Sequence, residues 1–238
     1  AEGRSAEFQA HFRGTHFFNP PRYMRLLEII PHAATKTDLV RSVADFGERV
    51  LGKGVVLGKD TPNFIANRLA SQVWHDINYT LEHGYSVEEA DALAGPLIGR
   101  PNTAIFRLRD LVGLDVSSRV AANLYAAIPH DPYREYLMAP RVVGLREQML
   151  ARGWLGLKTG QGFYKAVMTA EGRQFWPLDL KSFEYKPPVP VDLPRLTEAL
   201  QIGDLAQRLR FLVSEDDRVG RFVWAVLSHL ACYSAACI

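Results

Sequence analysis

The sequence predicts a mainly α protein that begins with the edge of an α/β domain and continues as an all-helical domain. Two observations lead to this prediction. Short strand-like segments and one helix alternate over the first 58 residues, and only helix-like segments follow up to about residue 152. Strands grouped at one end of a chain and helices at the other indicate two differently built parts rather than one alternating sheet.

The composition excludes several classes of protein. The 238 residues are 47% hydrophobic and 23% charged, and their 28 basic and 26 acidic side chains leave a net charge of +2. This balance gives no reason to expect a nucleic-acid partner. No apolar run approaches the roughly 20 residues that span a bilayer, and the first residues lack a signal-peptide pattern. With only Cys232 and Cys237, five apart, we expect reduced thiols, no disulfide framework and a cytoplasmic location.

The first 58 residues predict strand, strand, helix and strand in that order. Residues 11–18 and 24–30 read as short strands joined by an Asn-Pro-Pro turn. Apolar positions then recur every three or four residues from Leu39 to Val50, and Gly52 follows, which is typical of an amphipathic helix over 35–51. Residues 54–58 form the last short strand of this part.

The following residues predict helices. We expect a long helix over 63–82 before Gly84, a helix over 86–94 that opens with a capping box at Ser86, a helix over 104–128 with a break near Gly113, and a helix over 133–152. The stretch 166–193 is rich in proline and is expected to be a linker or wrapped loop rather than a regular element. A helical pair over 194–213 and 219–238 ends the sequence, and residues 67–79 and 220–233 resemble each other weakly.

Glycine-rich segments and histidines give no cofactor or metal motif. Residues 156–162 (GLKTGQG) lack the order of a phosphate-binding loop, and residues 52–58 (GKGVVLG) lack the G-x-G-x-x-G dinucleotide pattern. We interpret these glycines as turn residues. The seven histidines form no H-x-x-x-H pattern, so no metal site is predicted.

One segment combines a histidine with a carboxylate. Two hairpin-linked strands would bring His16 and Glu28, twelve positions apart, next to each other. A carboxylate bonded to one imidazole nitrogen fixes the tautomer, and the other nitrogen then serves as general base. Asn19 and Asn67 are candidates to donate hydrogen bonds to a substrate oxygen. Taken alone, however, these residue types favour a packing role for His16 and a solvated position on an edge strand for Glu28.

Four segments in one order carry a resemblance to a known family. They are residues 14–30, which contain GTHFFNP and MRLLEII, residues 59–68 (KDTPNFIANR), residues 109–115 (RDLVGLD) and residues 155–165 (LGLKTGQGFYK). Together they resemble the 3-hydroxyacyl-CoA dehydrogenases. The segment 183–188 (FEYKPP) and the helical pair after it resemble the longer, multifunctional fatty-acid oxidation proteins, in which the helical domain is duplicated.

The resemblance implies an oxidoreductase that converts (S)-3-hydroxyacyl-CoA to 3-ketoacyl-CoA with NAD in fatty-acid β-oxidation. His16 would be the general base and Glu28 its orienting partner, while Asn19 and Asn67 would line the acyl-CoA site. The resemblance also implies a possible homodimer through the helical domain and a possible fused enoyl-CoA hydratase domain.

The resemblance also implies a division of the chain. Residues 1–58 would be the C-terminal tail of a Rossmann-like NAD-binding domain, 59–165 the helical dehydrogenase domain, 166–193 a linker and 194–238 a partial second helical repeat. Two departures matter. Asn63 replaces the glycine of the family's second motif, and we expect the turn to survive because asparagine tolerates unusual backbone angles. The family's glycine loop and upstream substrate-contacting serine are absent, so we expect an internal fragment that has no cofactor-binding residues, leaves NAD to an upstream domain and is inactive by itself.

Two other functions remain open at this point. The chain could be a non-catalytic helical dimerisation or scaffold module in which His16 is retained for packing. It could also be a dehydrogenase of free hydroxy acids or sugar acids, whose helical domains are built on similar lines. The HFFNP and D-x-P-x-F-x-x-N-R segments favour an acyl-CoA substrate over this second alternative.

Overall fold

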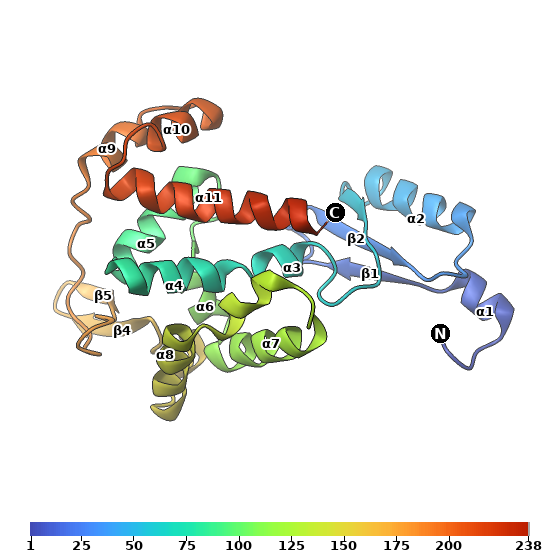
Figure 1. Cartoon of the computed structure of the whole chain (residues 1–238), viewed down its shortest axis with the longest axis horizontal. Helices are drawn as coiled ribbons and strands as arrows, with labels where there is room; N and C mark the ends of the chain where they lie inside the picture. Colours follow the sequence, from blue (N-terminus) through green and yellow to red (C-terminus); the bar gives the residue numbers. More distant parts are fainter. Residues whose placement is uncertain (238) are drawn as a thin grey trace. The chain divides into compact units, whose positions relative to one another are not determined.

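The computed structural model describes residues 1–237, which form two compact units (Figure 1). Residues 1–70 contain a three-stranded sheet, and the residues from 71 onward contain most of the helices and a hairpin. The first unit extends past residue 58, the end of the predicted first domain. It does so because the segment after the last strand turns back to the sheet, where the amides of Ile65 and Ala66 donate to the Glu28 carboxylate.

The sheet of the first unit has the order β1-β2-β3, with β1 at Arg13–Phe17, β2 at Leu26–Pro31 and β3 at Gly54–Leu57. Strand β1 runs antiparallel to β2, as the hairpin-linked pair predicts, and β3 runs parallel to it. The parallel pair needs a crossover, which is supplied by helix α2 (Thr37–Arg49). Helix α2 packs on β2 and β3 (Figure 1), and Gly47 permits the close approach, since a Cβ there would lie 2.9 Å from a Val55 methyl group. A short helix, α1 (Ala6–His11), precedes the sheet.

The helix predicted over 63–82 is two helices in the structure. Helix α3 spans Ala66–Ala70 and helix α4 spans Val73–His83. The first begins later than predicted because Asn63 and Phe64 have φ angles of 63° and 51°, outside the helical region. Helix α4 ends at Gly84, which takes the left-handed conformation expected of a glycine cap.

The second unit is built around one core of helices. Its first elements are α5 (Val87–Leu93), η1 (Pro96–Ile98), α6 (Phe106–Val112), α7 (Leu114–Ala127), η2 (Pro132–Met138), α8 (Pro140–Ala151) and η3 (Leu157–Thr159). The capping box at Ser86 and the break at Gly113 are both confirmed. The helix predicted over 133–152 is divided before Pro140, because proline cannot donate the hydrogen bond that would continue the preceding turn.

The prediction that residues 166–193 lack regular structure is wrong for its first part. Strands β4 (Tyr164–Thr169) and β5 (Gly172–Pro177) form an antiparallel hairpin. Its tight turn depends on Gly172, which has a φ of 110°. The prolines that suggested a loop lie at the end of β5 and beyond it, where they do not interrupt the ladder.

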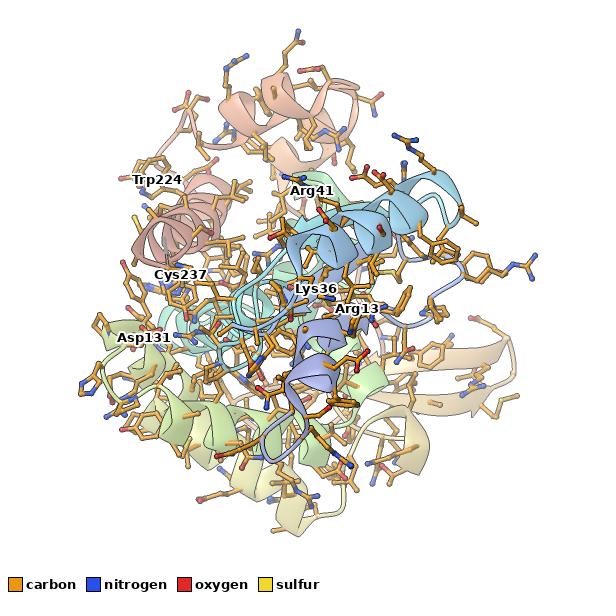
Figure 2. All side chains as sticks on the ribbon, turned by 90° about the vertical axis from the view of Figure 1, so that its right-hand side faces the viewer. Arg13, Lys36, Arg41, Asp131, Trp224 and Cys237 are labelled. Carbon is orange, nitrogen blue, oxygen red and sulfur yellow. The ribbon has the colours of Figure 1, made fainter. Side chains whose placement is uncertain are left out.

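The last helices belong to the same core as the earlier ones. They are α9 (Pro194–Leu200), α10 (Leu205–Leu212) and α11 (Arg218–Ala236). The predicted helix 194–213 is interrupted around Gly203, and residue 238 of the predicted last helix lies outside the described residues. Val219, Phe222 and Val226 of α11 are buried in the core that α4 and α5 also form. Trp224 projects from the other side of α11 and is 62% exposed (Figure 2).

Two further observations concern the described residues. Cys232 and Cys237 are free, exposed thiols on and next to α11. Within residues 1–237, no helix is both long enough and apolar enough to cross a membrane.

Candidate active site

The first unit pairs a histidine with a buried carboxylate. His16 of β1 lies directly opposite Glu28 of β2 in the antiparallel register, so the two side chains project from the same face. The distance from His16 Nδ1 to Glu28 Oε2 is 2.6 Å, which confirms the predicted juxtaposition. Glu28 is completely buried, whereas the His16 side chain is 28% exposed. An ionised carboxylate only accepts hydrogen bonds, so Nδ1 carries the hydrogen and Nε2 is left as the basic nitrogen.

The second oxygen of Glu28 has partners that sequence reasoning missed. Oε1 accepts hydrogen bonds from the amides of Ile65 at 3.0 Å and Ala66 at 2.8 Å. These amides begin α3, where no helical carbonyl is available to them. A buried carboxylate is costly unless it is fully hydrogen-bonded, and three donors meet that need here. The position of Glu28 in a continuous apolar run, LLEII, was the available signal that further donors were required.

A left-handed turn delivers those amides. Asn63 and Phe64 both have positive φ, and the Phe64 amide donates to the Thr61 carbonyl at 2.9 Å. The expectation that the turn survives with asparagine in place of glycine is confirmed, since Asn63 adopts a φ of 63°. For phenylalanine the same conformation costs about 1–3 kcal/mol, so the surrounding contacts must hold Phe64 in place.

Aromatic rings flank the imidazole of His16. The ring centroid of Phe18 lies 4.6 Å from that of His16, and the centroid of Phe64 lies 5.6 Å from it. Both rings are tilted by nearly 60° against the imidazole. The histidine is therefore held on Nδ1 by the carboxylate and on its faces by apolar groups.

Of the two predicted substrate-binding asparagines, Asn19 lies three residues after His16 and Asn67 lies next to Ala66, which binds Glu28. Asn19 is exposed in the loop after β1, which the Lys53 ammonium ties down through the carbonyls of Pro21 and Met24. Asn67 is exposed in α3, directly after one of the amides that bind Glu28. Among the described residues, no hydrogen bond joins either asparagine to His16 or Glu28.

Two other family-like segments meet in the second unit and have a structural role. Asp110, from the segment 109–115, accepts hydrogen bonds at 2.8 Å from the amides of Phe163 and Tyr164, in the segment 155–165. Burial raises the pKa of Asp110 to about 6. Gly162 permits this contact, because a Cβ there would lie 2.1 Å from Asp110 Oδ1. The interpretation of Gly156 and Gly160 as turn residues is confirmed by their positive φ angles.

No metal centre is found within residues 1–237, where no three histidine, cysteine or carboxylate side chains come together. The connection from β2 to α2 within the sheet unit, residues 32–36, contains no glycine. The described residues therefore offer no cradle for the diphosphate of a dinucleotide of the kind that glycine loops provide.

Comparison with known proteins identifies relatives of both units. Residues 4–61 match the family model "3-hydroxyacyl-CoA dehydrogenase, NAD binding domain", and residues 64–166 match "3-hydroxyacyl-CoA dehydrogenase, C-terminal domain". A probable 3-hydroxyacyl-CoA dehydrogenase of Bacillus subtilis is 44% identical over 99% of this chain and 29% of its own length. A putative fatty acid oxidation complex trifunctional enzyme of Rickettsia prowazekii is 30% identical over 78% of this chain and 26% of its length.

A solved structure is similar as well. The crystal structure of (S)-3-hydroxybutyryl-CoA dehydrogenase PaaH1 from Ralstonia eutropha superposes with a TM-score of 0.54 at 32% identity, over 63% of this chain and 50% of that one. The chain thus spans half or less of the length of each of these relatives. The two adjoining family matches correspond to the sheet edge and the helical part of the fold, and the chain belongs to the 3-hydroxyacyl-CoA dehydrogenase family.

Proposed function

We propose that this chain carries the proton-transfer residues of an NAD-dependent 3-hydroxyacyl-CoA dehydrogenase, which oxidises (S)-3-hydroxyacyl-CoA to 3-ketoacyl-CoA in fatty-acid oxidation. The observation that carries the proposal is the 2.6 Å contact between His16 Nδ1 and the buried Glu28 carboxylate, in a chain of this family. The name of the Rickettsia relative supports the fatty-acid context.

Each residue of the site has a defined role in this proposal. Nε2 of His16 takes the proton of the 3-hydroxyl group. Glu28 keeps the hydrogen on Nδ1 and stabilises the positive charge that the imidazole acquires. Asn19 and Asn67 donate hydrogen bonds to oxygens of the acyl-CoA. NAD, when bound, supplies the hydride acceptor.

The described residues do not fit a complete NAD site, since they lack a glycine loop between a strand and a helix. We therefore propose that NAD is held mainly by residues outside these 238. No contact to the cofactor is assigned to this chain.

The test compares His16→Gln with His11→Gln in the full-length protein, with NAD and 3-hydroxybutyryl-CoA as substrates. Removing a general base costs roughly 10² to 10⁴-fold in rate, so His16→Gln should lose most of the turnover. His11 is an exposed histidine on α1 whose ring contacts the Glu7 carbonyl, and its variant should keep wild-type turnover. Equal rates in both variants would refute the assignment of His16.

The alternatives make different demands on the site. A scaffold module does not need a histidine that is hydrogen-bonded to a buried carboxylate. This alternative therefore gives no reason for the burial of Glu28. A dehydrogenase of free hydroxy acids would use the same base, so it is tested by offering 3-hydroxybutyrate in place of its CoA ester. Turnover of the free acid alone would replace the acyl-CoA proposal.

Assembly and location are further parts of the proposal. Exposed apolar side chains on α6 and α7 support a homodimer through the helical unit; they are Leu111, Val112, Val116 and Val120. The mass of the protein in solution, measured by light scattering, tests it. A fused enoyl-CoA hydratase domain and a cytoplasmic location are also proposed, and are tested by hydratase assay of the full-length protein and by cell fractionation.

A further inference from the structure

Phe64 contacts one member of the histidine–glutamate pair and directly precedes the two residues that bind the other. Its ring packs against the imidazole of His16, with 5.6 Å between the centroids. Its backbone leads directly into the amides of Ile65 and Ala66, which bind Glu28 Oε1.

The backbone of Phe64 is the second observation. Its φ of 51° is a conformation that bulky L residues rarely adopt and that glycine adopts freely. Two consecutive left-handed residues, Asn63 and Phe64, reverse the chain so that the next two amides converge on one carboxylate oxygen. Strained residues of this kind occur where the surrounding structure over-determines them, often at functional sites. Here the residue that carries the strain is also one whose ring packs against His16.

We propose that Phe64 is a positioning residue for the base His16, an inference that rests on the proposed dehydrogenase function. Its left-handed backbone places the two amides that hold Glu28, and its ring limits the rotation of the imidazole. Together these contacts keep the hydrogen on Nδ1 and direct Nε2 toward the reacting hydroxyl group. Phe18 packs nearer to the imidazole, but its neighbours in the chain supply none of the amides that bind Glu28 Oε1.

The first test reads the tautomer of His16 without requiring activity. Nitrogen chemical shifts of isotope-labelled histidine distinguish a protonated Nδ1 from a protonated Nε2, and His16→Gln identifies the His16 signals. The wild-type protein should show one fixed tautomer with the hydrogen on Nδ1. Phe64→Gly keeps the turn, because glycine accepts a positive φ, but removes the ring. Its His16 signals should shift toward an average of the two tautomers, while Phe64→Tyr, which keeps the ring, should retain the wild-type signals.

The second test is kinetic and has a matched control. Phe183 has a positive φ of 58°, close to the 51° of Phe64, but its ring packs on Trp154 in the other unit. Phe183→Gly therefore makes the same substitution at a left-handed position away from His16. Phe64→Gly should lower kcat about 10-fold with little change in KM, since a base that is loosely held loses orientation rather than substrate affinity. Phe183→Gly should leave kcat within about 2-fold of the wild-type value.

The results separate this inference from the proposed function. Wild-type tautomer and kcat in Phe64→Gly would overturn the positioning role. An equal loss of kcat in Phe183→Gly would also overturn it, because the effect would then be a general one. If the full-length wild-type protein lacks dehydrogenase activity, the proposed function fails, and the tautomer comparison still decides whether Phe64 holds His16.

Discussion

Replacing Glu28 by glutamine changes the site without changing its shape. The amide of glutamine has one acceptor and one donor where the carboxylate has two acceptors. The oxygen is expected to face the amides of Ile65 and Ala66, because that orientation keeps two hydrogen bonds, whereas the reverse would keep one and set NH₂ against two N–H donors. The NH₂ group then faces Nδ1 of His16. Nδ1 must then accept a hydrogen bond, so the hydrogen moves to Nε2. An Nε2 that carries the hydrogen cannot act as a base.

The magnitude follows from these contacts. Two backbone hydrogen bonds persist but lose their charged acceptor, and hydrogen bonds to charged groups contribute about 1.5–3 kcal/mol against about 1 kcal/mol for neutral ones. Glu28→Gln should therefore lower the free energy of unfolding by about 1–3 kcal/mol and leave the protein folded. The wrong tautomer should cost roughly 10² to 10⁴-fold in kcat, which corresponds to about 3–5 kcal/mol in the activation barrier.

The assay follows NADH formation from 3-hydroxybutyryl-CoA, and urea denaturation measures the stability of the same samples. Glu7→Gln, on the exposed helix α1, is the control for loss of a carboxylate and should behave as wild type in both measurements. A Glu28→Gln protein that is folded and retains wild-type kcat would refute the argument from tautomers. A kcat loss no larger than the fraction of protein found unfolded would refute it as well.

Three further predictions concern stability. Gly162→Ala places a Cβ 2.1 Å from Asp110 Oδ1 and should lower the free energy of unfolding by about 3 kcal/mol. Gly160 has a φ of 74° and no atom within 4 Å of a Cβ, so Gly160→Ala should lower it by only about 1 kcal/mol. Equal losses in the two variants would contradict the contact with Asp110. Burial and the neighbouring charge of a second histidine lower the pKa of His229 to about 4 from 6.5, so the unfolded state binds more protons between these values and stability should fall as the pH drops through that window. The raised pKa of Asp110 has the opposite effect on stability at acidic pH, so the test compares wild type with His229→Phe. The pH dependence of the free energy of unfolding should be weaker in this variant by up to about 2 kcal/mol, after allowance for the partial exposure of His229. Parallel curves of stability against pH for the two proteins would contradict the prediction. Asn63→Ala should lower the melting temperature more than Asn63→Gly, because alanine tolerates a φ of 63° less well than glycine. Equal losses would contradict this, because they would point to the side chain that both variants remove rather than to the φ angle.

The sequence was sufficient to predict the central geometry of the candidate site. Two hairpin-linked strands joined by the Asn-Pro-Pro turn place positions on opposite sides of that turn next to each other, so His16 and Glu28 were expected to be neighbours. The burial of Glu28 and its second pair of donors could not be predicted in the same way. They depend on residues 65 and 66, which lie 37 and 38 positions further along the chain.

Two misjudged elements show why local patterns were insufficient. The helix expected from residue 63 begins at Ala66, because Asn63 and Phe64 take left-handed conformations directly before the two amides that bind Glu28. The hairpin β4–β5 was missed because proline content dominated the interpretation of a segment in which alternation was weak. In both places a tertiary contact or a single glycine overrides the local composition.

The histidine, its carboxylate and the amides that fix the carboxylate all belong to residues 1–70. Insertions, deletions and surface changes in the helical unit can therefore accumulate without altering the hydrogen bonds of the base. A protein organised in this way can exchange or duplicate its helical part during evolution while it inherits the His16–Glu28 pair intact. The same organisation suits engineering, because helical units from relatives can be recombined with this sheet edge while the contacts of His16 and Glu28 stay unchanged.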